Sequence, residues 1–230
     1  MMGDRVDVAA AADEAVPTAH RYIVVEGPIG VGKTSLARRL SRSFGSELVL
    51  EQDDENPFLE RFYRNPRAAA FQTQLYFLFQ RARQLQELRQ ADLFETVRVA
   101  DYLLDKDRLF ARLTLDDEEF ALYEQVYARL AIDAPVPDLV IYLQAPVDVL
   151  QGRIARRGIA YEQQMERRYL ERLAEAYSRF FLEFEAAPLL IVNAAAIDPI
   201  GSEADYGSLL TEIARPRRGR HYFNPLKNLL

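Results

Sequence analysis

Tyr22-Ile-Val-Val-Glu-Gly27-Pro-Ile-Gly-Val-Gly32-Lys33-Thr34-Ser35 is the stretch of sequence that decides the fold. An apolar run rich in β-branched residues leads into Gly27, and apolar residues with helical spacing resume after Thr34, so a strand, a glycine loop and a helix are expected. The segment Gly27-x-x-x-x-Gly32-Lys33-Thr34 matches the whole P-loop pattern. A chance match in a glycine-containing turn is the alternative, but the strand before the loop and the helix after it favour phosphate binding.

A P-loop binds nucleotide phosphates mainly through its backbone. Its glycines allow N–H groups to turn toward phosphate oxygens, and the helix that follows presents its positive N-terminal end. Lys33 is then expected to reach the β- and γ-phosphates of ATP, and the Thr34 hydroxyl to hold Mg²⁺. The loop residues predicted to bind the nucleotide are Gly27, Pro28, Ile29, Gly30, Val31, Gly32, Lys33, Thr34 and Ser35.

The composition describes a globular protein without cysteine chemistry. With 230 residues, 49% of them hydrophobic, the chain can bury a single core. It has no cysteine, and its two histidines, His20 and His221, lie near the ends. No apolar run approaches the roughly 18 residues of a membrane-spanning helix. The net charge of −6 argues against nucleic-acid binding, so we expect a cytoplasmic protein with neither a membrane nor a nucleic-acid partner.

A single domain is expected between two terminal segments. Residues 1–19 are rich in alanine but carry four acids, which is wrong for a signal or transit peptide, so we predict a disordered leader. The domain is predicted to span residues 20–214. Residues 215–230, which begin with Arg215-Pro-Arg-Arg-Gly-Arg220, are predicted to form a basic tail.

Further short apolar runs predict additional strands that form a parallel sheet with the first. Five strands are expected, with helices on both faces, in a P-loop NTPase-type α/β fold; they cover residues 21–26, 48–50, 96–100, 139–143 and 189–192. Glu51 and Asp101 directly follow the second and third of these strands, where an open α/β sheet places its ligand crevice. We predict that Asp101 holds Mg²⁺ together with Thr34.

Two helices carry polar residues that point to a ligand. In the helix predicted from 66 to 91, Gln74 and Arg81 are seven residues apart on one stripe, where they could read the edge of a planar base. Near the end of a later helix, Arg153, Arg156 and Arg157 share one face. Like charges repel unless an anion lies opposite, so the arginines predict a lid over phosphates at residues 153–162. An ordinary basic helix end is the alternative.

Taken together, these motifs resemble the deoxynucleoside kinase family, especially bacterial deoxyadenosine and deoxyguanosine kinases. The resemblance covers roughly residues 21–193. It rests on Gly27 to Ser35, Glu51, Glu55-Asn-Pro-Phe-Leu-Glu-Arg-Phe-Tyr63, Ala70-Phe-Gln-Thr-Gln74 with Arg81, Asp101-Tyr102 with Phe110-Ala111, and Arg153-Ile-x-x-Arg157-Gly158 with Glu162.

The resemblance implies Mg²⁺- and ATP-dependent phosphorylation of the 5′-hydroxyl of a deoxyribonucleoside, a purine one by preference, in nucleotide salvage. It further implies a homodimer. The roles that it gives to single positions are the general base for Glu51, the 3′-hydroxyl contacts for Tyr63 and Glu162, recognition of the base edge for Gln74, a second base-pocket position for Arg81, stacking on the base for Phe110, and closure on the donor phosphates for Arg153 and Arg157.

The chain departs from the family pattern at two positions. Relatives often have arginine after the acid of the third strand, where this chain has Tyr102, and Lys106 or Arg108 could replace that charge. Relatives often continue the lid as Arg-Gly-Arg, where this chain has Ile159, so Arg156 could serve as the further lid arginine. Two other functions stay open: a nucleoside monophosphate kinase of the thymidylate kinase type, which would need cations near Glu51, and a non-catalytic P-loop protein.

Overall fold

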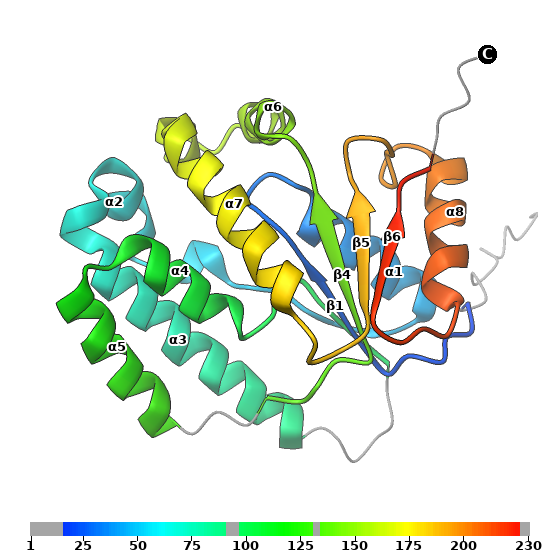
Figure 1. Ribbon diagram of the computed structural model, residues 1–230, viewed down its shortest axis with the longest axis horizontal. Helices are drawn as coiled ribbons and strands as arrows, with labels where there is room; N and C mark the ends of the chain where they lie inside the picture. Colours follow the sequence, from blue (N-terminus) through cyan, green and yellow to red (C-terminus); the bar gives the residue numbers. More distant parts are fainter. Residues whose placement is uncertain (1–15, 91–96, 131–133, 226–230) are drawn as a thin grey trace, which may run out of the picture.

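The computed structural model describes residues 16–90, 97–130 and 134–225, which form a parallel sheet covered by helices (Figure 1). All strand pairs are parallel, in the order β2-β3-β1-β4-β5-β6. The predicted fold class is confirmed, whereas the predicted number of five strands is wrong. The strands are β1 (Tyr22–Glu26), β2 (Glu47–Val49), β3 (Arg98–Ala100), β4 (Leu139–Gln144), β5 (Leu189–Asn193) and β6 (Arg220–Phe223).

The additional strand, β6, comes from the segment predicted to be a basic tail. Its first residue pairs with Leu189 of β5, and the Arg220 guanidinium donates hydrogen bonds to the carbonyl oxygens of Phe181 and Leu182 at 3.0 and 2.5 Å. Sequence patterning missed this strand because Arg220 and His221 break the apolar run. An edge strand tolerates such residues, since one side of its ladder faces solvent.

Helices cover both faces of the sheet. The α-helices are α1 (Lys33–Phe44), α2 (Leu59–Arg64), α3 (Pro66–Gln90), α4 (Lys106–Thr114), α5 (Asp117–Leu130), α6 (Val147–Arg157), α7 (Arg167–Glu183) and α8 (Glu203–Ala214), with 3₁₀ turns η1 (Asp53–Glu55) and η3 (Glu162–Gln164). One core joins the sheet to α1, α6 and α8, and a second joins its other face to α3, α4 and α7. Figure 1 shows α5 outside α3 and α4, away from the sheet.

Alternation along the strands explains why two cores form. Ile23 and Val25 of β1 belong to the core beside α1, while Val24 between them belongs to the core beside α7. All three are fully buried. A parallel strand covered on both faces has such a continuous apolar sequence, and the sheet therefore presents only its carboxyl edge for a site.

The residues near the two termini are partly packed onto the domain. Of the predicted leader, residues 1–15 lie outside the described residues, but the Val16 amide donates a hydrogen bond to the Ser43 carbonyl oxygen at 2.7 Å. The buried His20 ring lies 3.0 Å from the Ile213 carbonyl oxygen. Residues 226–230 of the predicted tail also lie outside the described residues. Within the described ranges, no helix is both long and apolar enough to cross a bilayer.

Candidate active site

The glycine loop runs from the end of β1 to the start of α1 and packs closely against neighbouring backbone. Gly27 has φ +150°, and a Cβ atom there would lie 2.4 Å from the Leu143 carbonyl oxygen. A Cβ atom on Gly30, which has φ +82°, would lie 2.8 Å from the Leu150 carbonyl oxygen. Both positions therefore require glycine, because side chains would clash and the φ angles are unfavourable for other residues. α1 begins directly after Gly32, so its N-terminus faces the loop.

Two hollows meet at this loop. We name the first the carboxylate cavity; it has a volume of about 910 Å³, and its lining includes Glu51, Asp53, Asp101 and Glu162. We name the second the arginine hollow; it has a volume of about 600 Å³, and its lining includes residues 30–36, Arg153 and Arg156. The residues that line both are Gly30, Lys33, Thr34 and Arg157.

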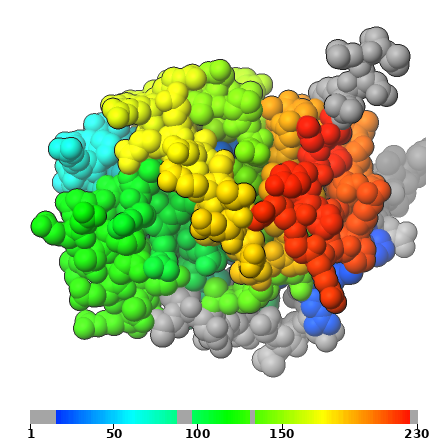
Figure 2. All heavy atoms as spheres, viewed as in Figure 1, coloured from blue at the N-terminus to red at the C-terminus, as the bar shows by residue number. Residues whose placement is uncertain are grey.

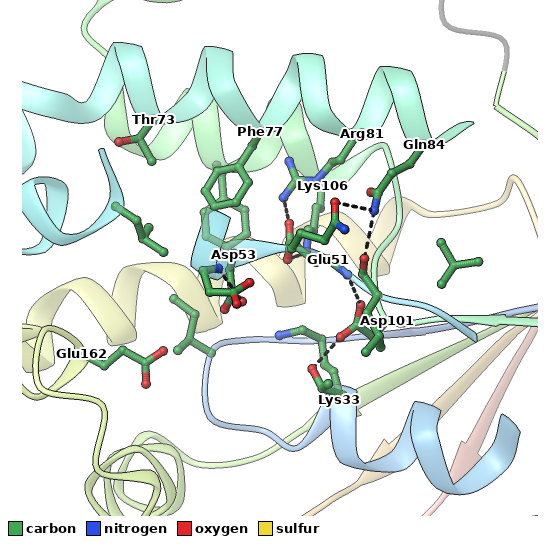
Figure 3. A pocket seen from close by; sticks show the side chains of 18 of the residues that line it. Lys33, Glu51, Asp53, Thr73, Phe77, Arg81, Gln84, Asp101, Lys106 and Glu162 are labelled. Carbon is green, nitrogen blue, oxygen red and sulfur yellow. Dashed lines mark hydrogen bonds and ion pairs between the residues drawn. The ribbon is translucent and has the colours of Figure 1, made fainter. Parts of the chain in front are cut away.

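The structure brings the two predicted metal-binding residues together. The Thr34 hydroxyl donates a hydrogen bond to Asp101 Oδ2 at 2.5 Å, and Asp101 Oδ1 accepts from the Glu51 amide at 2.8 Å. Asp101 thereby links the P-loop helix to the end of β2 (Figure 3). Hydroxyl and carboxylate oxygens fit Mg²⁺, which takes few protein ligands when phosphate oxygens complete its shell.

Glu51 is held between two cations. Arg81 donates to Glu51 Oε1, and Lys106 Nζ donates to Glu51 Oε2 at 2.7 Å. Burial alone would raise the pKa of Glu51, but the charges and hydrogen bonds of Arg81 and Lys106 outweigh burial and bring this pKa far below its usual value. Arg81 also donates to the fully buried Asp107. Glu51 is therefore ionised throughout the neutral pH range.

A second buried carboxylate lies behind this pair. Glu26, at the end of β1, has no exposed surface and accepts hydrogen bonds from the Gly27 amide at 3.0 Å and the Tyr177 hydroxyl at 2.9 Å. Its Oε2 accepts from the Leu103 amide at 2.8 Å and lies 3.9 Å from Lys106 Nζ. Glu26 thus connects the P-loop, the segment after β3 and α7.

The predicted sugar-binding residues lie together in the carboxylate cavity, which Tyr63 and Glu162 both line. Burial raises the pKa of Tyr63, and the nearby Tyr169 and Glu162 add to this effect. Burial also raises the pKa of Glu162, against the opposing charge of Arg157, whose guanidinium lies 2.5 Å from the carboxylate. Arg157 therefore contacts the acid of the 3₁₀ turn in this structure.

The predicted base-binding residues come from α3 and α4. Gln74 and Phe110 line the carboxylate cavity together with Arg81. Figure 3 shows Phe77 and Arg81 of α3 directed into this cavity. The Phe110 ring meets that of Tyr177 edge to face, with 6.0 Å between the centroids, so its position is fixed by α7.

The predicted lid arginines lie at the end of α6, around the arginine hollow. Arg153 donates to the carbonyl oxygens of Val31 and Ala194, both at 2.7 Å, and so connects the P-loop with the end of β5. Arg156 is exposed and donates to the Gly152 carbonyl oxygen of its own helix at 3.4 Å. α6 ends at Arg157, and Gly158, which caps it, has φ +75°.

A family model and several known proteins match this chain over most of its length. The model described as deoxynucleoside kinase matches residues 23–216. The chain belongs to the deoxynucleoside kinase family. Deoxyguanosine kinase from Bacillus subtilis is 33% identical over 197 residues, which cover 84% of this chain and 95% of that protein. Deoxyadenosine/deoxycytidine kinase from the same organism is 29% identical over 202 residues, 84% and 91% of the two chains.

The solved structure of deoxyadenosine kinase from M. mycoides with bound dATP has the same fold as this deoxynucleoside kinase. The TM-score is 0.73 at 24% sequence identity, over 85% of this chain and all of that chain. In the chain described here, the sequence analysis did not identify Glu26 and Asp107 as residues that support the site. Glu26 ends an apolar strand and precedes a glycine, so only its acidity within a buried run could have indicated a role.

The structure also decides which basic residue of α4 lies at the site. Lys106 contacts Glu51, whereas Arg108 projects to the surface of this kinase and pairs with Glu124 at 2.7 Å. Of the two residues that could replace the arginine found after the third-strand acid in relatives, Lys106 lies at the site and Arg108 does not.

Proposed function

We propose that this deoxynucleoside kinase transfers the γ-phosphoryl group of ATP to the 5′-hydroxyl of a deoxyribonucleoside. The observation that carries the proposal is that Lys33 and Thr34 line both hollows, while Glu51 lines only the carboxylate cavity. A triphosphate bound at the P-loop would end where the two hollows meet. An alcohol in the carboxylate cavity would then lie between that phosphate and Glu51.

Glu51 is proposed to orient the acceptor hydroxyl and to take its proton. Phosphoryl transfer proceeds through a loose transition state, so the acceptor needs alignment more than early deprotonation. An ionised carboxylate whose pKa lies below its usual value suits that task, since it is always ready to accept a hydrogen bond. Holding the two reactants in line supplies much of the remaining acceleration.

The cationic groups are proposed to act on the donor phosphates. Lys33 reaches the β- and γ-phosphates, and the arginines of the lid, Arg153 and Arg157 with Arg156, stabilise charge on the phosphoryl oxygens. Arg153 already bonds the P-loop through Val31, so its charge is held beside the arginine hollow before ATP arrives. Arg157 would leave Glu162 or bridge it to the phosphates.

Mg²⁺ is proposed to bind at Thr34 and Asp101, whose oxygens lie 2.5 Å apart. When bound, the ion would neutralise phosphate charge. The pair itself orders the site, because Asp101 also accepts from the Glu51 amide. A carboxylate at this strand end thus connects the metal-binding group with the acceptor-binding group.

The acceptor is proposed to be a purine deoxyribonucleoside, and the kinase to serve nucleotide salvage in the cytoplasm. Tyr63 and Glu162 would bind the 3′-hydroxyl, Gln74 and Arg81 the base edge, and Phe110 the base face. The purine preference draws on the similarity to deoxyguanosine kinase and to deoxyadenosine/deoxycytidine kinase, whose names both include a purine deoxyribonucleoside. A glutamine can turn its amide to suit several bases, so Gln74 alone does not select one.

A transfer assay tests the function directly. Purified protein is incubated with ATP, Mg²⁺ and, separately, each of the four deoxyribonucleosides, adenosine and thymidine monophosphate, and the phosphorylated product is measured. The expected product is a purine deoxyribonucleoside monophosphate. Diphosphate formed from the monophosphate alone would indicate the monophosphate kinase instead. ATP binding without any product would indicate the non-catalytic P-loop protein.

A homodimer is also proposed, with exposed apolar side chains of α3 and α5 as candidate contacts. Phe79 of α3 and Leu122 of α5 are 51% and 48% exposed, although both are large and apolar. Figure 2 shows α5, in green, on the flank of the molecule. Contiguous exposed apolar patches mark protein interfaces, and these two side chains are the candidates to contribute to one. Light scattering should give twice the 26.4 kDa chain mass; a mass of one chain would contradict the dimer.

A further inference from the structure

Lysine is rare in this chain, and its positions are therefore informative. Of 29 basic residues, only Lys33, Lys106 and Lys227 are lysines, and the others are arginines. Lys227 lies outside the described residues. Both lysines that are described lie at the carboxylate cavity. Lys33 belongs to the P-loop pattern, but no motif accounts for Lys106.

The surroundings of Lys106 are those of a buried cation with a defined task. Its side chain is 3% exposed, and Nζ lies 2.7 Å from Glu51 Oε2 and 3.9 Å from Glu26 Oε2. Nζ also lies 5.9 Å from the centroid of the Tyr102 ring. A buried ammonium requires such compensation, because an unpaired charge in this environment would cost several kcal/mol. The fully buried Glu26 is itself anchored by hydrogen bonds from three other groups, so it holds Lys106 in place.

We propose that Lys106 is a positioning residue for Glu51: its ammonium, held by Glu26 and Tyr102, fixes one carboxylate oxygen of Glu51. This inference rests on the proposed function of Glu51. Arg81 binds the other oxygen, so the two cations together set the plane of the carboxylate. Lys106 acts through Glu51, without needing to touch either substrate.

A compact ammonium suits this position better than a guanidinium. Lysine presents a point charge on a narrow stem, while arginine needs room for a planar fork. Lys106 lies among buried groups of β1, α3 and α4, with Arg81 already occupying part of the space around Glu51. The proposal therefore predicts that arginine at this position restores charge but only part of the rate.

The first experiment compares Lys106→Met, Lys106→Arg and the control Arg108→Met. Arg108 is on the same helix but is exposed and paired with Glu124. We expect Lys106→Met to lower kcat by about 10²-fold, with KM for ATP changed less than about threefold, and Lys106→Arg to recover part of kcat. Arg108→Met should retain wild-type kinetics. A kcat for Lys106→Met within about twofold of wild type would overturn the proposal.

A chemical rescue separates charge from packing and also covers a poorly folding Lys106→Met. Because the chain has no cysteine, Lys106→Cys carries a unique thiol. It can be alkylated in denaturant with 2-bromoethylamine, which rebuilds a lysine-like ammonium, or with neutral iodoacetamide, and then refolded beside wild type. Recovery of kcat with the ammonium alone supports the proposal. Equal recovery with both groups, or with neither, overturns it.

A crystal structure of Lys106→Met keeps this inference separate from the proposed function. Lys106 and Arg81 each hold one oxygen of the Glu51 carboxylate, so we expect the carboxylate to turn to another rotamer in the variant while the P-loop stays unchanged. A Glu51 carboxylate in its wild-type position overturns the positioning role, whereas absence of turnover in the wild type overturns only the kinase function.

Discussion

The arginine hollow and the carboxylate cavity share the P-loop but differ in how their charges are balanced. In the arginine hollow, the hydrogen bonds of Arg153 within the described residues go to neutral carbonyl oxygens, those of Val31 and Ala194, although Asp198 also lines the hollow. In the carboxylate cavity, Arg81 and Lys106 are already paired with Glu51. Arg153 therefore keeps positive charge available for an anion in the hollow, while in the cavity the two cations beside Glu51 are already compensated before a ligand enters.

This difference explains which ligand each region suits. A triphosphate brings charge that the arginine hollow can balance, so electrostatics can hold it there. A nucleoside is neutral and gains little from uncompensated charge; it needs hydrogen-bonding groups that are already oriented. The ion pairs of Glu51 supply that orientation. Three predictions test the comparison, in order of decreasing effect.

The largest effect is expected from Glu51→Gln, which removes the acceptor carboxylate and leaves the arginine hollow intact. We expect turnover to fall by about 10²- to 10⁴-fold, because the amide can still occupy the site but accepts a proton poorly. ATP binding, measured by calorimetry, should stay within about threefold of wild type. Near-normal turnover would remove Glu51 from the proposed role.

The sequence anticipated the regions unequally, for a physical reason that Glu51 illustrates. A P-loop is contiguous, so residues 27–35 carry their own signal, and the carboxyl ends of strands indicated Glu51 and Asp101. The partners of Glu51 come from α3 and α4, far away in the chain. Periodicity cannot specify which side chains meet across such distances.

Strand prediction had a similar limit. Strands buried on both faces were found from their apolar runs, with ends differing by one or two residues within the described parts. β6 was missed because Arg220 and His221 are tolerated only at an edge of the sheet. Glu26 was missed because its partners lie far away in the sequence. The Leu103 amide, the Tyr177 hydroxyl and Lys106 compensate its buried charge, and nothing in the apolar run around Glu26 indicates them.

A smaller effect is expected in the arginine hollow, from Arg153→Met. Removing one preorganised cationic donor should lower kcat by about 10²-fold, while nucleoside binding in the carboxylate cavity stays unchanged. Arg156→Met should have a weaker effect, because the Arg156 side chain is exposed and donates to a carbonyl oxygen of its own helix. Steady-state kinetics with each substrate varied in turn would check this.

Arg167→Met is a matched control for the arginine variants. Arg167 is a half-exposed arginine at the start of α7, paired with Asp148 and Glu171 on the surface. Its loss should leave kinetics unchanged. If Arg153→Met and Arg167→Met had equal effects on kcat, the contrast between the hollow and the surrounding surface would be lost.

The smallest effect concerns stability against acid, and it isolates the ion pairs of the carboxylate cavity. The pKa of Glu51 is lowered in the folded protein, so its contribution to stability is fully present above the pKa of the unfolded chain. That contribution decreases as pH falls below the usual range for glutamate, about 4.3, toward the folded-state pKa. Glu51→Gln should therefore reduce the free energy of unfolding by about 3 kcal/mol at pH 7, since it leaves two buried cations less well paired, and by less at pH 3.5.

Urea unfolding of both proteins at the two pH values measures the difference. If Glu51→Gln lowered the free energy of unfolding equally at both pH values, Glu51 would stabilise the protein by packing. The side chains of the carboxylate cavity would then be ordered by their shapes, and the ion pairs would not distinguish this cavity from the arginine hollow.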